Sequence, residues 1–175
     1  MSEQHIFLVG PMGVGKTSVG RQLASLLHRP FVDVDAEIES RSGADIQWIF
    51  DMEGEAGFRK RETKVLGDIV ANSASSVIAT GGGVVMSKEN RKILQSNGQV
   101  IYLSVSKEQL YERMRKDKSR PLLQVENREK VIDDLIELRD PLYREIADVV
   151  FAAEAGSAHR VAKVLLDELS KHWKF

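Results

Sequence analysis

The first residues whose types and spacing suggest chemistry are residues 10–17, which read Gly-Pro-Met-Gly-Val-Gly-Lys-Thr. They match the phosphate-binding pattern Gly-x-x-x-x-Gly-Lys-Ser/Thr. Glycines there let consecutive backbone N–H groups turn toward an anion, and the N-terminus of the following helix adds its positive end. Lys16 is a point charge for the β- and γ-phosphates, and the Thr17 hydroxyl suits Mg²⁺. The motif predicts a nucleoside triphosphate site but does not specify the reaction.

Two carboxylates, Asp33 and Asp35, lie two residues apart at the end of the predicted strand at 31–34. The alternation of side chains along a strand places both on the same side. Beside bound phosphates, one can join a magnesium shell through water and the other can hold an acceptor hydroxyl. No acid follows the run at 77–79, which favours Asp33 for the metal. The alternative is a solvated strand end at which Asp35 caps the next helix.

Two arginines are candidates for binding a substrate carboxylate. Arg59 and Glu62 are three residues apart in a helical segment and therefore share a face. Spacing alone favours a surface ion pair, whereas the functional interpretation is a bidentate clamp on a carboxylate. Arg139 stands two residues before Pro141 in a long helical segment. Without further context, that segment is an ordinary charged helix face.

Two segments with unusual composition complete the set of candidates. The run of Gly81, Gly82 and Gly83 follows an apolar run and removes side chains where a small molecule can approach the backbone. Arg120 lies in a charged stretch, 117–127, which contains Pro121 and interrupts the helical pattern. That stretch is either a solvated loop or a closing lid that brings an arginine to the phosphates.

The elements that must position these residues alternate along the chain. Short apolar runs occur at 6–9, 31–34, 77–79, 100–103 and 149–151, and segments with helical periodicity separate them. The helical pattern between 35 and 73 is broken near Gly43 and Gly54. This alternation predicts an α/β fold with a parallel sheet covered on both faces. Ligands in such folds bind beyond the carboxyl ends of the strands, where the candidate residues lie.

Composition excludes several classes of function. The chain has 175 residues, which fits a single domain over 1–175, and its formal net charge of -1 gives no global attraction to nucleic acid or anionic membranes. It has no cysteine, so disulfides, thiolate zinc sites and iron–sulfur clusters are excluded. Its 4 histidines have no ligand spacing. The apolar run at 6–9 is too short to span a membrane, so we expect a cytoplasmic protein that binds neither nucleic acid nor membrane.

The combination of motifs resembles the shikimate kinase family over nearly the full length of the chain. The segments that carry the resemblance are Asp33-Val34-Asp35, Gly57-Phe58-Arg59 with Glu62, Gly81-Gly82-Gly83, Arg120-Pro121-Leu122-Leu123 and Arg139-Asp140-Pro141-Leu142-Tyr143. The resemblance implies ATP-dependent phosphorylation of the shikimate 3-hydroxyl, in the pathway to chorismate and the aromatic amino acids. It also implies a nucleoside-monophosphate-kinase-like P-loop fold with a five-stranded parallel sheet, a substrate-binding subdomain at 33–62 and a lid at 113–126.

The family's residue roles carry over to the matching positions. The resemblance implies that ATP is bound by Gly13, Val14, Gly15, Lys16, Thr17, Ser18, Arg113 and Arg120, and more weakly by Gly156 in the adenine-flanking segment 153–157. It implies a Mg²⁺ site at Thr17 and Asp33, and shikimate contacts from Asp35, Arg59, Gly81, Gly82, Gly83 and Arg139. The residues expected to act in catalysis are Lys16, Asp35 and Arg120. The chain is expected to act as a monomer.

Two other functions stay open from sequence alone. One is another small-molecule kinase of the same fold, such as gluconate kinase, because gluconate also carries a carboxylate and hydroxyls. The glycine run and the Arg139-Asp140-Pro141-Leu142-Tyr143 segment argue against it. The other is an ATP-binding switch that hydrolyses ATP slowly. Such a switch has no need of two acids and two arginines arranged for an acceptor.

Overall fold

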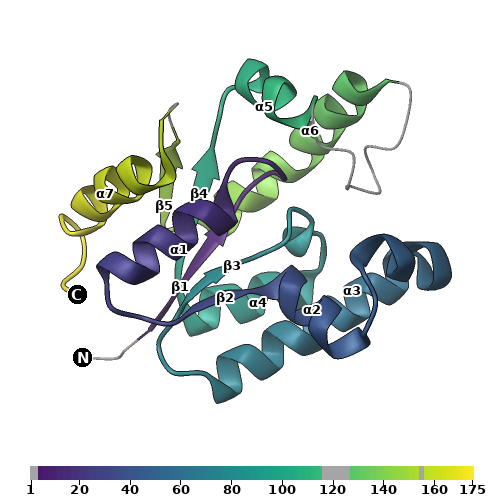
Figure 1. Ribbon diagram of the computed structural model, residues 1–175, viewed down its shortest axis with the longest axis horizontal. Coiled ribbons are helices and arrows are strands. Elements are labelled where there is room, and N and C mark those ends of the chain that lie inside the picture. The colour runs from purple at the N-terminus through teal and green to yellow at the C-terminus, as the bar shows by residue number, and fades with distance from the viewer. Residues whose placement is uncertain (1–3, 116–126, 154–155) are drawn as a thin grey trace.

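The computed structural model describes residues 4–115, 127–153 and 156–175. Its centre is a five-stranded sheet with the order β2-β3-β1-β4-β5 (Figure 1). All neighbouring strands are parallel, which confirms the predicted α/β fold. The strands are β1 (His5–Val9), β2 (Phe31–Asp33), β3 (Val77–Ala79), β4 (Gly98–Ser104) and β5 (Val149–Ala152).

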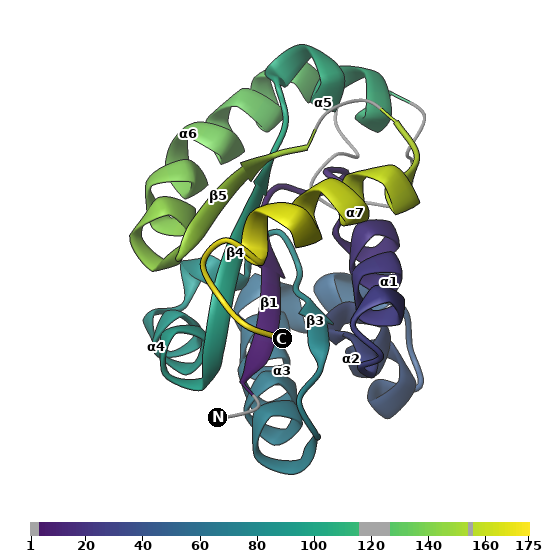
Figure 2. The same ribbon diagram turned by 90° about the vertical axis from the view of Figure 1, so that its left-hand side faces the viewer.

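Helices cover both faces of the sheet (Figure 2). One face packs against α1 (Lys16–Leu26) and α7 (Ala158–Leu169). The other packs against α2 (Val34–Ser42), α3 (Ile46–Asn72), α4 (Lys88–Asn97) and α6 (Arg128–Ile146). The remaining described helices are α5 (Lys107–Met114), which packs on α6, and a short 3-10 turn, η1 (Val84–Met86). None of the described helices combines the length and the apolar composition needed to cross a bilayer.

The apolar strands follow from this two-sided covering. In β1, Phe7 and Val9 belong to the core on the α3–α4 side, whereas Ile6 and Leu8 belong to the core on the α1–α7 side. All four side chains are fully buried. A strand that is buried on both faces has no solvent-facing position, so its sequence shows a continuous apolar run rather than an alternation.

Glycines set the helix boundaries between β2 and β3. Gly43 ends α2 with a φ of 70°, and Gly54 has a φ of 71° at a kink inside α3. Both glycines have a positive φ, which glycine adopts at little cost, so the breaks in the helical pattern lie where the sequence predicts them.

One local prediction is wrong. β2 ends at Asp33, and Asp35 lies in the first turn of α2 rather than at the end of the strand. Asp33, not Asp35, is the N-cap, since its Oδ1 accepts a hydrogen bond from the Ala36 N–H at 3.1 Å. The strand alternation that we applied to both acids therefore does not hold. A carboxylate cap satisfies one of the unpaired N–H groups of the first helical turn, which favours starting α2 directly after Asp33.

The strand order brings the candidate residues to one edge of the sheet. β1 is the central strand of the sheet. β3 and β2 lie on one side of it, and β4 and β5 lie on the other. The connection after β1 leads to β2 at one edge of the sheet, and the connection after β3 leads to β4 on the other side of β1. Because these two connections run in opposite directions, a crevice opens between them at the carboxyl ends of the strands. Residues 10–15, Asp33 and the glycine run all follow directly at that edge.

Candidate active site

The phosphate loop, residues 10–17, depends on backbone conformations that favour glycine. Gly13 and Gly15 have φ values of 81° and 100°, and Gly15 is the N-cap of α1. Lys16 is buried, and its Nζ donates hydrogen bonds to the carbonyl oxygens of Gly10 at 2.7 Å and Pro11 at 2.8 Å. The loop thus holds the ammonium group over its own concave face, as a phosphate-binding lysine requires.

The structure brings Thr17 and Asp33 together. The Thr17 hydroxyl donates to Oδ2 of Asp33 at 2.7 Å, across the gap between α1 and β2. Both are hard oxygen ligands of the kind that Mg²⁺ prefers. The described residues contain no group of three or more His, Cys, Asp or Glu side chains suited to a metal. An oxygen pair beside a phosphate loop fits the usual Mg²⁺ arrangement, in which phosphates and water complete the shell.

The other predicted nucleotide contacts surround this loop. The Arg113 guanidinium, from α5, donates to the carbonyl oxygens of Val14 at 2.7 Å and Gly13 at 3.3 Å. Ser18 lies in the first turn of α1, and Gly156 lies in the connection between β5 and α7 with a φ of 149°. Arg120, and the lid from residue 116 onward, fall outside the described residues.

A second group of predicted residues lines a cleft that is open to solvent, which we call the acceptor cleft. Its polar lining comes from α2, α3, α6 and the turn after β3, so helices and a loop far apart in sequence meet there. Asp35, Arg59, Gly81, Gly82, Gly83 and Arg139 all contribute to it, together with Glu62. Its apolar walls are formed by Met12, Ile46, Phe50 and Phe58.

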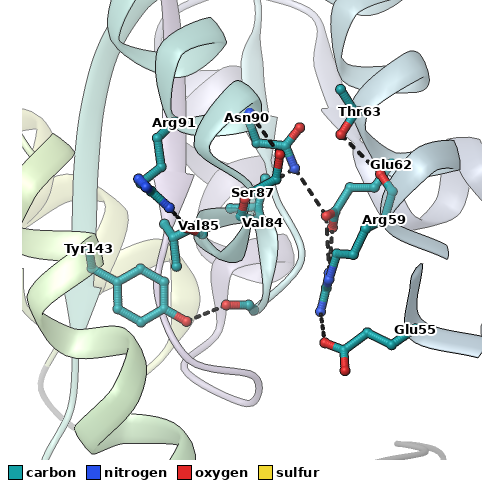
Figure 3. Close-up of polar contacts among 11 residues, drawn as sticks. Glu55, Arg59, Glu62, Thr63, Val84, Val85, Ser87, Asn90, Arg91 and Tyr143 are labelled. Carbon is teal, nitrogen blue, oxygen red and sulfur yellow. Dashed lines mark hydrogen bonds and ion pairs between the residues drawn. The ribbon is translucent and has the colours of Figure 1, made fainter. Parts of the chain in front are cut away.

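Arg59 and Glu62 form an ion pair inside the protein. Their side chains are 15% and 0% exposed, so the surface ion pair that spacing alone favoured is wrong. The Arg59 guanidinium contacts both Glu62 carboxylate oxygens, at 3.0 and 3.2 Å, and Glu55 at 3.4 Å (Figure 3). From α4, the Asn90 amide donates to Glu62 Oε1 at 3.2 Å. Burial raises the pKa of Glu62 to about 7, against the opposing effect of the Arg59 charge.

Arg139 lacks the partner that Arg59 has. It is only 4% exposed, and it forms no ion pair with any carboxylate in the described part of the chain. Its buried Nε atom has no hydrogen-bond partner there either. Burial lowers the pKa of this guanidinium. A buried cation without a counter-ion is costly, so this position is suited to an anionic ligand that completes the pairing.

The acceptor cleft adjoins a larger cleft over the phosphate loop, which we call the phosphate cleft. Lys16, Thr17 and Asp33 line the phosphate cleft. Asp35, Met12 and the first two glycines of the run line both. Asp35 therefore stands at the boundary between the two clefts, where an acceptor hydroxyl would face a phosphate. Met12 was not among the predicted site residues, although its place within the phosphate-loop motif is a signal that it lies near the ligand.

A phosphate loop joined to a cleft lined with cationic and acidic side chains defines a P-loop kinase for a small acceptor molecule. The family model described as shikimate kinase matches residues 12–170 of the chain. The chain belongs to the shikimate kinase family.

Individual relatives agree with this assignment. The chain is 51% identical to a shikimate kinase of Pasteurella multocida over 166 residues, which is 94% of both chains. Its fold is similar to that of the shikimate kinase of Acinetobacter baumannii in complex with shikimate, with a TM-score of 0.91, 50% identity and coverage of 98% of this chain and 96% of that one. A gluconokinase from Sinorhizobium meliloti has a TM-score of 0.54 at 20% identity, covering 97% of this chain and 94% of that one, which shows the shared fold alone.

Proposed function

We propose that this protein transfers the γ-phosphoryl group of ATP to the 3-hydroxyl of shikimate, giving shikimate 3-phosphate and ADP. Family membership and the adjoining clefts support this proposal, and one observation carries it. Arg139 is buried in the acceptor cleft beside Arg59, and it has no carboxylate partner among the residues that the structure describes. Shikimate supplies the missing anion as well as hydroxyl groups for Asp35 and for the glycine run.

The acceptor is bound through its carboxylate and its hydroxyls. The guanidinium groups of Arg59 and Arg139 take the carboxylate, for which their planar forks are suited. The ion pair with Glu62 fixes the Arg59 side chain before the substrate binds, so less side-chain entropy is lost on binding. With its carboxylate bound by the two arginines, the acceptor ring presents its hydroxyl groups to Asp35 and to the phosphate cleft.

The donor is ATP, held by the amides of the phosphate loop and by Lys16. Thr17 and Asp33 are the residues that would hold Mg²⁺, which supplies charge neutralisation for the β- and γ-phosphates. Arg113 already contacts the backbone of the phosphate loop, so its guanidinium stands at the base of the nucleotide site. Arg120 reaches the phosphates from the lid in this proposal, by resemblance to the family.

The reaction is a direct in-line transfer without a phosphoenzyme. Asp35 accepts a hydrogen bond from the acceptor hydroxyl and orients its oxygen toward the γ-phosphorus. The oxygen–phosphorus bond forms as the bond to the β-γ bridging oxygen breaks, and the hydroxyl proton leaves by way of Asp35 or of solvent. Lys16 stabilises the charge that spreads over the transferred group. Positioning and charge neutralisation supply most of the acceleration in such reactions.

The test is an acceptor panel. The protein is incubated with Mg²⁺ and ATP together with shikimate, quinate, gluconate or no acceptor, and ADP release is followed. We expect rapid ADP release only in the reaction that contains shikimate as the acceptor. A Lys16→Ala variant that retains its fold should release ADP only at the background rate. Rapid release with gluconate would favour the related kinase instead. ADP release at the same rate with every acceptor and without one would favour the ATP-binding switch.

A further inference from the structure

We propose that Tyr143 is a positioning residue for the acceptor cleft, whose hydroxyl fixes the backbone of the glycine run so that its N–H groups face the substrate. This inference rests on the proposed function, because it concerns the affinity of the same cleft for shikimate. Tyr143 does not line the acceptor cleft itself, so its hydroxyl acts through the groups that it contacts, which are the Gly82 carbonyl and the Arg139 guanidinium, whose pKa it raises against the larger lowering effect of burial.

The contact joins two elements that are far apart in sequence. Tyr143 lies on α6, one helical turn after Arg139, and only 1% of it is exposed. Its hydroxyl donates a hydrogen bond to the carbonyl oxygen of Gly82 (Figure 3). A single helix therefore carries both a cation of the acceptor cleft and the group that holds the cleft's glycine backbone.

This hydrogen bond determines where a backbone donor points. In a trans peptide group the carbonyl oxygen and the following N–H point in opposite directions. With the Gly82 carbonyl directed at Tyr143, the N–H of Gly83 is directed away from α6. No hydrogen bond of the described residues is donated by the backbone N–H of Gly81, Gly82 or Gly83, and all three glycines line the acceptor cleft. These donors are thus available to a ligand.

The glycine run needs such an anchor because it cannot be held by side-chain packing. Glycine samples more backbone conformations than any other residue, and ordering three in a row is costly in entropy. The hydroxyl of Tyr143 is well suited to the task. Burial raises the pKa of Tyr143 to about 12, so the group stays protonated and donates throughout the neutral range. Its ring is fixed against that of Tyr102, with ring centroids 4.9 Å apart.

Tyr102 provides a matched control. It belongs to the same ring pair, and its hydroxyl donates to Asp140 Oδ1 at 2.7 Å rather than to the glycine run. Tyr143→Phe and Tyr102→Phe each remove one hydroxyl and keep the ring. A purely structural role for Tyr143 predicts the same behaviour for both variants, whereas a positioning role predicts a selective effect on shikimate.

The experiment compares steady-state kinetics and thermal unfolding of the wild type and both variants, with calorimetric titration of shikimate without nucleotide. Losing one hydrogen bond that organises the cleft should raise the KM and Kd for shikimate about three- to tenfold in Tyr143→Phe. The KM for ATP should stay unchanged, and Tyr102→Phe should keep the wild-type KM for both substrates.

Three results would overturn the inference while leaving the proposed function intact. They are an unchanged shikimate KM in Tyr143→Phe, an equal rise in Tyr102→Phe, and a parallel rise in the KM for ATP. If the wild type itself fails to phosphorylate shikimate, that result contradicts the proposed function, and with it this inference.

Discussion

The two arginines of the acceptor cleft are held in different ways, and this difference bears on what each can do. Arg59 is fixed by the buried carboxylate of Glu62, which in turn receives the amide of Asn90. Arg139 has no ion-pair partner among the described residues, and it is buried on α6 next to the glycine run. A ligand carboxylate would therefore meet one pre-oriented fork and one unpaired cation.

Replacing either arginine with lysine tests this pairing. Arg59→Lys and Arg139→Lys keep the charge but lose the planar fork, so shikimate should bind about ten- to a hundredfold more weakly, as expected for losing a charge-assisted hydrogen bond. ATP affinity without shikimate should barely change. Calorimetric titration of each ligand measures both values. Arg41→Lys is the control and should behave as the wild type, because Arg41 forms an exposed ion pair with Glu37 on α2. Unchanged shikimate affinity in both test variants would contradict the carboxylate clamp.

Asp35 is the candidate for handling the acceptor hydroxyl. Asp35→Asn keeps the shape of the side chain and removes its charge, so kcat should fall by about two to four orders of magnitude while the KM for shikimate changes much less. Glu37→Gln, two residues further along α2 and paired with Arg41, is the matched control. A kcat within a few-fold of the wild type would assign Asp35 to binding alone.

The sequence predicted which side chains belong to the acceptor cleft better than it predicted how they are buried and what they contact. The spacing of Arg59 and Glu62 predicts their contact, and the contact is present. The pattern could not predict that both are buried, because burial depends on α4 and η1, which come from another part of the chain. Tyr143 is part of a quoted motif, but its partner Gly82 is 61 residues away and no local signal links them.

At the scale of elements, the turn between β3 and η1 fits the cleft only without side chains. A Cβ at Gly83 would lie 2.0 Å from Nη2 of Arg59, although the Gly83 φ of -95° suits any residue. Gly83→Ala should therefore displace the guanidinium rather than strain the backbone. We expect the KM for shikimate to rise at least about tenfold, again through a lost charge-assisted contact, with little change in the KM for ATP.

Gly67→Ala is the control for this substitution. Gly67 lies within α3, and a Cβ there would meet no atom within 4 Å. Alanine favours a helix more than glycine does, so this variant should be as active as the wild type and at least as stable. A Gly83→Ala variant with wild-type kinetics would show that Arg59 has room to move without consequence.

The elements themselves were largely predictable, because continuous apolar runs and glycine breaks are local signals. The run at 77–79 coincides with β3, and the breaks at Gly43 and Gly54 lie where the pattern places them. The error at Asp35 has a physical cause. A capping carboxylate at Asp33 starts α2 at Val34, one residue earlier than the apolar run at 31–34 indicates, and capping competes with strand extension at such a boundary.

At the scale of the whole molecule, the buried Glu62 links stability to pH. Its pKa is raised from an ordinary 4.5 to about 7 by burial, so the folded state binds this proton more tightly than the unfolded state. Its contribution to stability is fully present below about pH 4.5 and is lost as the pH rises through 7. Relative to Glu62→Gln, the wild type should lose roughly 2–3 kcal/mol of unfolding free energy between pH 5 and pH 8.

Urea unfolding at several pH values measures this difference. Glu53→Gln is the control, because the pKa of Glu53 is lowered by its hydrogen bond to Arg61. The contribution of Glu53 is lost only on acidification below its ordinary pKa, so its variant should differ from the wild type by a constant amount between pH 5 and pH 8. A constant difference for Glu62→Gln as well would mean that Glu62 does not titrate in this range.

That the chain acts as a monomer stays a prediction. So does the role of Arg120, which lies outside the described residues. Long-range closure of a lid has no local sequence signal beyond a charged segment interrupted by proline, and the family resemblance alone assigns it to the nucleotide.

The most direct test of the central claim is the fate of the γ-phosphoryl group. The wild-type protein is incubated with Mg²⁺, shikimate and ATP labelled in that group, and ADP and phosphorylated shikimate are quantified from the same samples. We predict one phosphorylated shikimate for each ADP, with the label on the 3-hydroxyl and almost no free phosphate. Label released as free phosphate, with no phosphorylated shikimate, would contradict the assignment of the acceptor cleft.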